Sequence, residues 1–164
     1  MTLIKDGKPV DDAWTVLGDE DPLVRDAPVI VTVGRWQASG SEELSKHNGP
    51  LGVWLKSDQP PELIAHDLGR FDLIALEFPA QADGRAFSYA SLLRQRHGFT
   101  GELRAVGRVT QDQLYFMQRC GFDSYQLSED QDPDKVVRAF GDFSAAYAPA
   151  ADGETPAYRR RFPR

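Results

Sequence analysis

Polar and charged side chains directly follow the strand-like runs of this sequence. One apolar run contains Glu77 and leads to Asp83 and Arg85, and a later run leads to Arg108. If the strands are parallel, these residues meet at one edge of a sheet, beside the helices that follow. Guanidinium groups and free helix N–H groups bind oxyanions such as carboxylate, phosphate, sulfate or sulfite. We therefore predict a small-oxyanion site made of Glu77, Asp83, Gly84, Arg85, Ser88, Arg108 and Gln113.

The same residues also fit a polar rim that binds no ligand. In this interpretation the arginines pair with neighbouring carboxylates, namely Arg35, Arg85 and Arg108 with Glu77, Asp83 and Asp112. Charge pairs are common on protein surfaces, so the rim is the simpler interpretation. No histidine, cysteine or carboxylate has a partner at a spacing typical of acid–base catalysis, and we assign no catalytic residue.

The remaining reactive residue types give little sign of a cofactor. Cys120 lies near the predicted C-terminal end of a helix, where the helix dipole disfavours a thiolate, so a buried structural role is favoured. The three histidines lack metal-ligand spacing, and one cysteine cannot hold an iron–sulfur cluster. The sequence has no GxGxxG, GxxxxGK[ST] or GxSxG motif. We expect no metal and no resident cofactor.

Composition places the chain among single-domain globular proteins. It has 164 residues, 41% of them hydrophobic, and a net charge of −6 that disfavours nucleic acid as a partner. The apolar runs are too short to span a membrane, and the first residues do not resemble a signal peptide. With a single cysteine, these features predict a cytoplasmic protein. The basic, aromatic segment 158–164 fits a solvated terminus or a contact with an acidic partner or RNA.

The elements that must position these residues alternate between strand and helix. Apolar runs predict strands at 29–33, 51–55, 72–78, 103–106 and 124–127. Helical spacing and end signals predict helices at 60–68, from 83 or 84 to 97, from 110 to 120 and from 132 to about 147. Thr110 and Gln113 match a capping box at the start of the third helix. The Asp6-Gly7 turn predicts a small hairpin before them.

This alternation predicts an α/β fold with a mostly parallel, five-stranded sheet flanked by helices. A flavodoxin-like sheet is the first choice and a partial βα barrel the second. We divide the chain into an N-terminal hairpin and loop at 1–27, an α/β domain at 28–147 and a loose C-terminal tail at 148–164.

Several segments together resemble a known bacterial family. They are Leu73–Pro79, Asp83-Gly84-Arg85, Ser88, Leu92-Leu93-Arg94, Gly101–Gly107, Asp112-Gln113 and Arg119–Asp123. With the upstream Asp12-Ala13-Trp14, they make the chain similar to the "domain of unknown function 934" family over about residues 4–140. The resemblance implies an oxidoreductase or accessory role in assimilatory sulfite reduction. The chain departs from the family pattern at Gln81-Ala82, where an aromatic residue is usual, and at Thr110.

Two functions follow from this resemblance. The first is a non-catalytic accessory protein that binds sulfite reductase, or the reductase of activated sulfate. The second is a small-anion-binding enzyme of sulfur metabolism that uses a soluble flavin or nicotinamide and holds the anion through Arg85 and Arg108. The absence of cofactor motifs favours the first.

Overall fold

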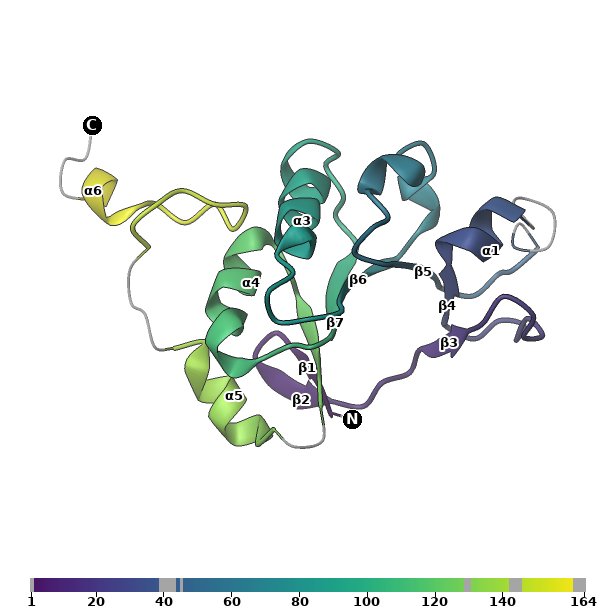
Figure 1. Cartoon of the computed structure of the whole chain (residues 1–164), viewed down its shortest axis with the longest axis horizontal. Coiled ribbons are helices and arrows are strands. Elements are labelled where there is room, and N and C mark those ends of the chain that lie inside the picture. The colour runs from purple at the N-terminus through teal and green to yellow at the C-terminus, as the bar shows by residue number, and fades with distance from the viewer. Residues whose placement is uncertain (1, 39–43, 45, 129–130, 142–145, 161–164) are drawn as a thin grey trace.

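The fold is built on one mixed sheet with helices packed on one face (Figure 1). The computed structural model describes residues 2–38, 44, 46–128, 131–141 and 146–160. Its eight strands lie in the order β2-β1-β8-β7-β6-β5-β4-β3. They are β1 (Thr2–Lys5), β2 (Lys8–Val10), β3 (Thr15–Leu17), β4 (Val29–Thr32), β5 (Leu51–Leu55), β6 (Leu73–Phe78), β7 (Glu102–Gly107) and β8 (Ser124–Leu127).

From β4 to β8, each strand pairs in parallel with the strand that precedes it in the chain. Right-handed crossovers between consecutive neighbours place all the connections on the same face of the sheet. This is the arrangement of half a βα barrel. The flavodoxin-like prediction is wrong, because that fold reverses its strand order and carries helices on both faces.

The prediction of five strands is also wrong, for two reasons. The strand β3 has only three residues, and its Thr15 and Val16 are exposed, so it carries no alternating burial pattern in the sequence. The predicted hairpin does form, but it is part of the main sheet: β1 pairs antiparallel with both β2 and β8. Burial of Leu3 and Ile4 accounts for this docking.

The helices differ from their predicted lengths. The segment expected to be helical at 60–68 forms only two 3-10 turns, η1 (Pro61–Leu63) and η2 (Leu68–Arg70). The other helices are α1 (Val33–Ala38), α3 (Arg85–Gln95), α4 (Leu114–Cys120), α5 (Pro133–Ala139) and α6 (Ala157–Arg160). The Asp132 side chain caps α5 by accepting a hydrogen bond from the Asp134 N–H. Part of the helix predicted after residue 132 lies outside the described residues.

The predicted capping box at the start of α4 does not form. A 3-10 turn, η3 (Gln111–Gln113), occupies this position instead, and Thr110 makes no side-chain capping bond. At its other end, α4 stops at Gly121 as expected. This glycine has a φ of 105°, and a Cβ there would lie 2.5 Å from Cγ of Arg94. Only glycine fits both the left-handed conformation and the close approach of Arg94.

The two faces of the sheet differ in character. The face toward the helices carries the main core, with Ile74, Leu76 and Phe78 of β6 as typical members. The opposite face carries a small cluster of Ile30, Leu73, Ala75 and Val106, on which Trp14 and Trp54 pack. Residues 11–14, here called the strap, join β2 at one edge of the sheet to β3 at the other and pass along this second face (Figure 1).

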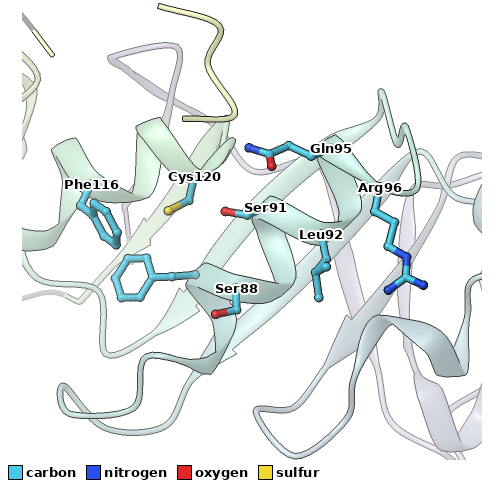
Figure 2. A pocket seen from close by; sticks show the side chains of 8 residues that line it. Ser88, Ser91, Leu92, Gln95, Arg96, Phe116 and Cys120 are labelled. Carbon is cyan, nitrogen blue, oxygen red and sulfur yellow. The ribbon is translucent and has the colours of Figure 1, made fainter. Parts of the chain in front are cut away.

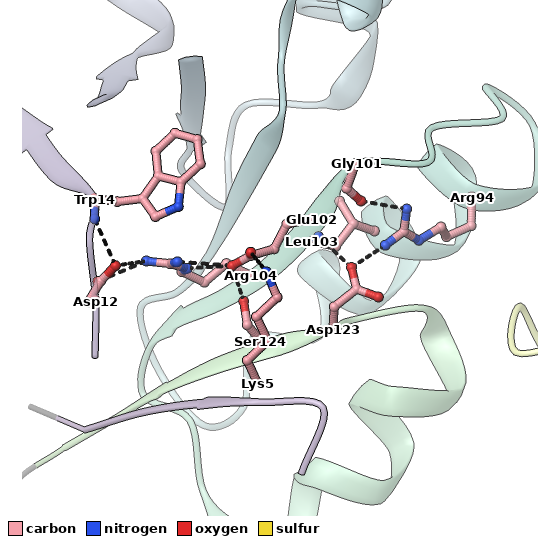
Figure 3. Close-up of polar contacts among 10 residues, drawn as sticks. All are labelled: Lys5, Asp12, Trp14, Arg94, Gly101, Glu102, Leu103, Arg104, Asp123 and Ser124. Carbon is pink, nitrogen blue, oxygen red and sulfur yellow. Dashed lines mark hydrogen bonds and ion pairs between the residues drawn. The ribbon is translucent and has the colours of Figure 1, made fainter. Parts of the chain in front are cut away.

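A buried arginine holds the strap on the sheet (Figure 3). The Arg104 side chain is only 2% exposed and points to this second face from β7. Its Nη1 donates to both carboxylate oxygens of Asp12 at 3.0 and 2.9 Å, and its Nη2 donates to Oε1 of Glu102 at 2.9 Å. Lys5 and Ser124 also donate to Glu102. The network therefore joins the strap, the hairpin and strands β7 and β8.

The Glu102 carboxylate stays ionised in this network. Burial alone would raise its pKa, but hydrogen bonds from Lys5 and Ser124 and the charge of Arg104 outweigh burial and lower the pKa below its ordinary value of 4.5. Glu102 therefore stabilises the fold above the pKa it has in the unfolded chain. This stabilisation is lost as the pH falls through the folded pKa.

We predict that Arg104→Ala lowers the free energy of unfolding by about 3–5 kcal/mol, because it removes the buried cation that binds both Asp12 and Glu102. Urea unfolding at pH 7 measures this. The matched control is Arg108→Ala, because Arg108 is an exposed arginine directly after the same strand, β7. This substitution is expected to change the free energy of unfolding by at most about 0.5 kcal/mol. If Arg104→Ala lowers the free energy of unfolding by less than about 1 kcal/mol, its effect is no larger than that of a surface substitution. This result would contradict the role assigned to the network.

Candidate functional site

The strand ends predicted to share an edge do share it, since β3 to β8 are parallel. At this edge Asp83 and Arg85 bind each other. Arg85 donates from Nε to Oδ1 of Asp83 at 3.0 Å and from Nη2 to Oδ2 at 2.7 Å, and its backbone N–H also donates to Oδ1 at 3.2 Å. This pairing is the one that the polar-rim interpretation expects.

Ser57 joins this pair from the loop after β5. Its Oγ accepts a hydrogen bond from Nη2 of Arg85 at 3.0 Å, and its carbonyl oxygen accepts one from the Tyr89 hydroxyl at 3.1 Å. The side chain is almost fully buried, at 8% exposure. Ser57 was not among the predicted site residues, although its place just after a strand was a usable signal.

The ion pair fixes the protonation of Asp83. The side-chain hydrogen bonds from Arg85, followed by the one from its backbone N–H, lower the pKa of Asp83 well below the ordinary 3.8. The pKa of Arg85 is correspondingly raised, chiefly by its hydrogen bonds to Asp83. The Arg85 side chain remains 54% exposed, so one side of the guanidinium still faces water.

The other predicted site residues make different contacts. Glu77 accepts a long hydrogen bond from Nε1 of Trp54 at 3.4 Å, and Gln113 donates from Nε2 to the Gln81 carbonyl at 3.2 Å. Arg108 is exposed, and its backbone N–H donates to the Phe78 carbonyl at 2.7 Å.

Two further predicted residues lie on or beside α3. Gly84 is its N-cap residue, and Ser88 faces a pocket between α3 and α4. The described contacts thus unite Asp83 and Arg85, with Ser57 added, and anion binding at this edge stays a prediction.

The pocket between α3 and α4 has a volume of about 690 Å³ (Figure 2). We call it the α3–α4 groove. It is lined by Phe87, Ser88, Ser91, Leu92 and Gln95 of α3, by Arg96 at the C-cap of α3, and by Phe116 and Cys120 of α4. Phe116 is 56% exposed. The Phe87 and Phe116 rings lie 4.9 Å apart at their centroids and are tilted by 53°. The groove thus presents aromatic and aliphatic surface to solvent.

The sequence of α3 explains why this side of the helix is open. Ala86, Ala90 and Leu93 recur at helical spacing and are buried against the sheet. The groove residues of α3 lie on its exposed half: Ser91 lies toward α4, whereas Leu92 and Arg96 lie on the side away from it (Figure 2). The groove could not be predicted from local sequence patterns, because it depends on how two separate helices lie side by side.

Cys120 at the end of this groove is a protonated thiol. Burial raises its pKa, which outweighs the hydrogen bond with Ser91 and the charge of Arg119. The neighbouring Arg119 binds Asp152, from Nε to Oδ2 at 2.8 Å. Arg119 thereby ties the start of the predicted tail to α4. The expected structural role of Cys120 agrees with its burial.

Residues 52–158 match the model of a family described as a bacterial protein of unknown function (DUF934). The chain belongs to this family. The DUF934 match runs from β5 to α6 and includes both the Asp83–Arg85 edge and the α3–α4 groove. A comparison with curated proteins finds no match. None of the helices in the described part of the chain is long and apolar enough to cross a membrane.

We predict that Asp83 stays ionised at pH values well below 3.8, because Arg85 binds its charged form. Carboxyl carbon shifts followed by NMR during an acid titration measure this directly. In Arg85→Ala the pKa of Asp83 should rise toward its ordinary value, whereas in Arg108→Ala it should remain low. An unchanged Asp83 titration in Arg85→Ala would show that the pair does not form in solution.

Proposed function

We propose that this protein is a non-catalytic accessory protein of assimilatory sulfate or sulfite reduction. Its partner is sulfite reductase or the reductase of activated sulfate. The pathway comes from what the DUF934 resemblance implies, and the accessory role comes from the surfaces described above. The observation that carries it is the α3–α4 groove, which offers apolar contact area without a reactive group.

The chemistry of the groove supports binding over catalysis. Its polar groups are two serine hydroxyls, the Gln95 amide and the Arg96 guanidinium, and its thiol is held protonated. None of these is paired with a general base in the way that nucleophilic catalysis requires. A half-exposed phenylalanine such as Phe116 is instead typical of surfaces that bind proteins.

A second candidate is an enzyme that binds a small oxyanion at Arg85 and uses a soluble flavin or nicotinamide. One observation favours it: the Arg85 side chain is 54% exposed at the edge where parallel α/β sheets bind ligands. Against it, the Asp83 carboxylate already occupies the face of the guanidinium that would bind the anion. An oxyanion would have to compete with a fixed negative charge.

We predict that a deletion strain fails to grow on sulfate or sulfite and grows on sulfide or cysteine as the sulfur source. Complementation with Arg85→Ala separates the two candidates. An accessory protein should restore growth with this variant as the wild type does, whereas an enzyme that holds its anion through Arg85 should not. Normal growth of the deletion strain on all four sources, with no second copy of the gene, overturns the proposed function.

A further inference from the structure

We infer that the α3–α4 groove binds an amphipathic helix of sulfite reductase, whose apolar side chains lie over Phe87 and Phe116 and whose carboxylate pairs with Arg96. The inference rests on the proposed function for the identity of the partner. It adds the surface, the secondary structure and the charge of the segment that is bound.

The length of the groove fits a helix. Its lining residues run along α3 from Phe87 to Arg96. At a rise of 1.5 Å per residue this is about 14 Å, or two and a half turns. A bound helix of that length presents side chains at i, i+3 or i+4 and i+7 on one side, which is the pattern by which grooves between helices recognise amphipathic helices.

The polarity of the groove argues against a small molecule. Small-molecule pockets place a few polar groups so that they converge on the ligand from several directions. Here the hydroxyls of Ser88 and Ser91 and the Gln95 amide all project from the single helix α3 (Figure 2). The opposite side is supplied by Phe116 and Cys120 of α4. Polar groups that project from one helix beside aromatic surface supplied by both helices suit a partner helix that is itself amphipathic.

The charge of the residues that line the groove indicates the charge expected on the bound helix. Arg96 is its one charged lining residue, and the lining contains no carboxylate. Within the described residues, no carboxylate forms an ion pair with Arg96, whereas Arg119 on the neighbouring helix is bound to Asp152. An acidic side chain on the incoming helix that lies near Arg96 therefore meets an available cation.

Three substitutions to glutamate test the inference in binding assays with purified sulfite reductase from the same organism. Phe116→Glu puts a charge into the apolar strip, and Arg96→Glu reverses the charge at its border. Leu63→Glu is the matched control, because Leu63 is also an exposed large hydrophobic residue, at 43%, but lies in η1 outside the groove. All three sites are exposed, so each variant is expected to fold, and urea unfolding verifies this.

We expect the two groove variants to weaken binding at least tenfold and Leu63→Glu to bind as the wild type does. Hydrogen exchange of the wild type should slow at 85–96 and 114–120 when the reductase is added. Wild-type affinity in both groove variants, protection confined to other segments, or no binding by the wild type overturns the inference. The proposed function is decided separately by the growth of the deletion strain, so the two can fail independently.

Discussion

The Arg104 guanidinium lies almost without water on one face of the sheet, and much of the N-terminal part of the fold is arranged around it. A buried cation is costly unless carboxylates and hydrogen bonds surround it. Here β7 supplies Glu102 and the strap supplies Asp12, while Lys5 and Ser124 complete the coordination of Glu102. This requirement fixes the position of the strap, brings the hairpin against β8 and covers the face of the sheet that has no helices. The strap leaves the helices on the other face, and the loops that join them to the strands, open to solvent.

On that side of the sheet, a charged region and an exposed apolar region lie apart from each other. At the carboxyl edge, Asp83 accepts two hydrogen bonds from the Arg85 guanidinium, and Ser57 accepts a third. These hydrogen bonds join the loop after β5 to the loop after β6. Between α3 and α4, apolar surface such as Phe116 is exposed, and Arg96 also lines the groove. The charges of Asp83 and Arg85 neutralise each other, and the α3–α4 groove presents exposed apolar side chains. Together these two features support the proposed binding role over the catalytic alternative.

The sequence predicts these features unevenly, and the reasons are physical. Strands β4, β5 and β6 could be read from nearly continuous apolar runs, because strands buried on both faces are mostly apolar. Strands β7 and β8 were also predicted, although they include buried polar residues, namely Arg104 and Ser124. The strap and the docking of the hairpin could not be predicted, since the contact of Lys5 with Glu102 joins residues 97 positions apart. The pairing of Asp83 with Arg85 was open to sequence reasoning because the two are close in the chain. The groove was not, because no local pattern fixes the distance between two helices.

The pairing of β1 with β8 also constrains how the chain reaches this structure on the ribosome. Thr2–Lys5 are synthesised more than a hundred residues before their partner strand is complete at Leu127. Until that strand has left the exit tunnel, Leu3 and Ile4 cannot take their places in the sheet. Non-local pairing of this kind slows folding and leaves apolar strand edges exposed in the meantime. A strand that is made long before its partner is therefore fixed in the sheet only after that partner has formed.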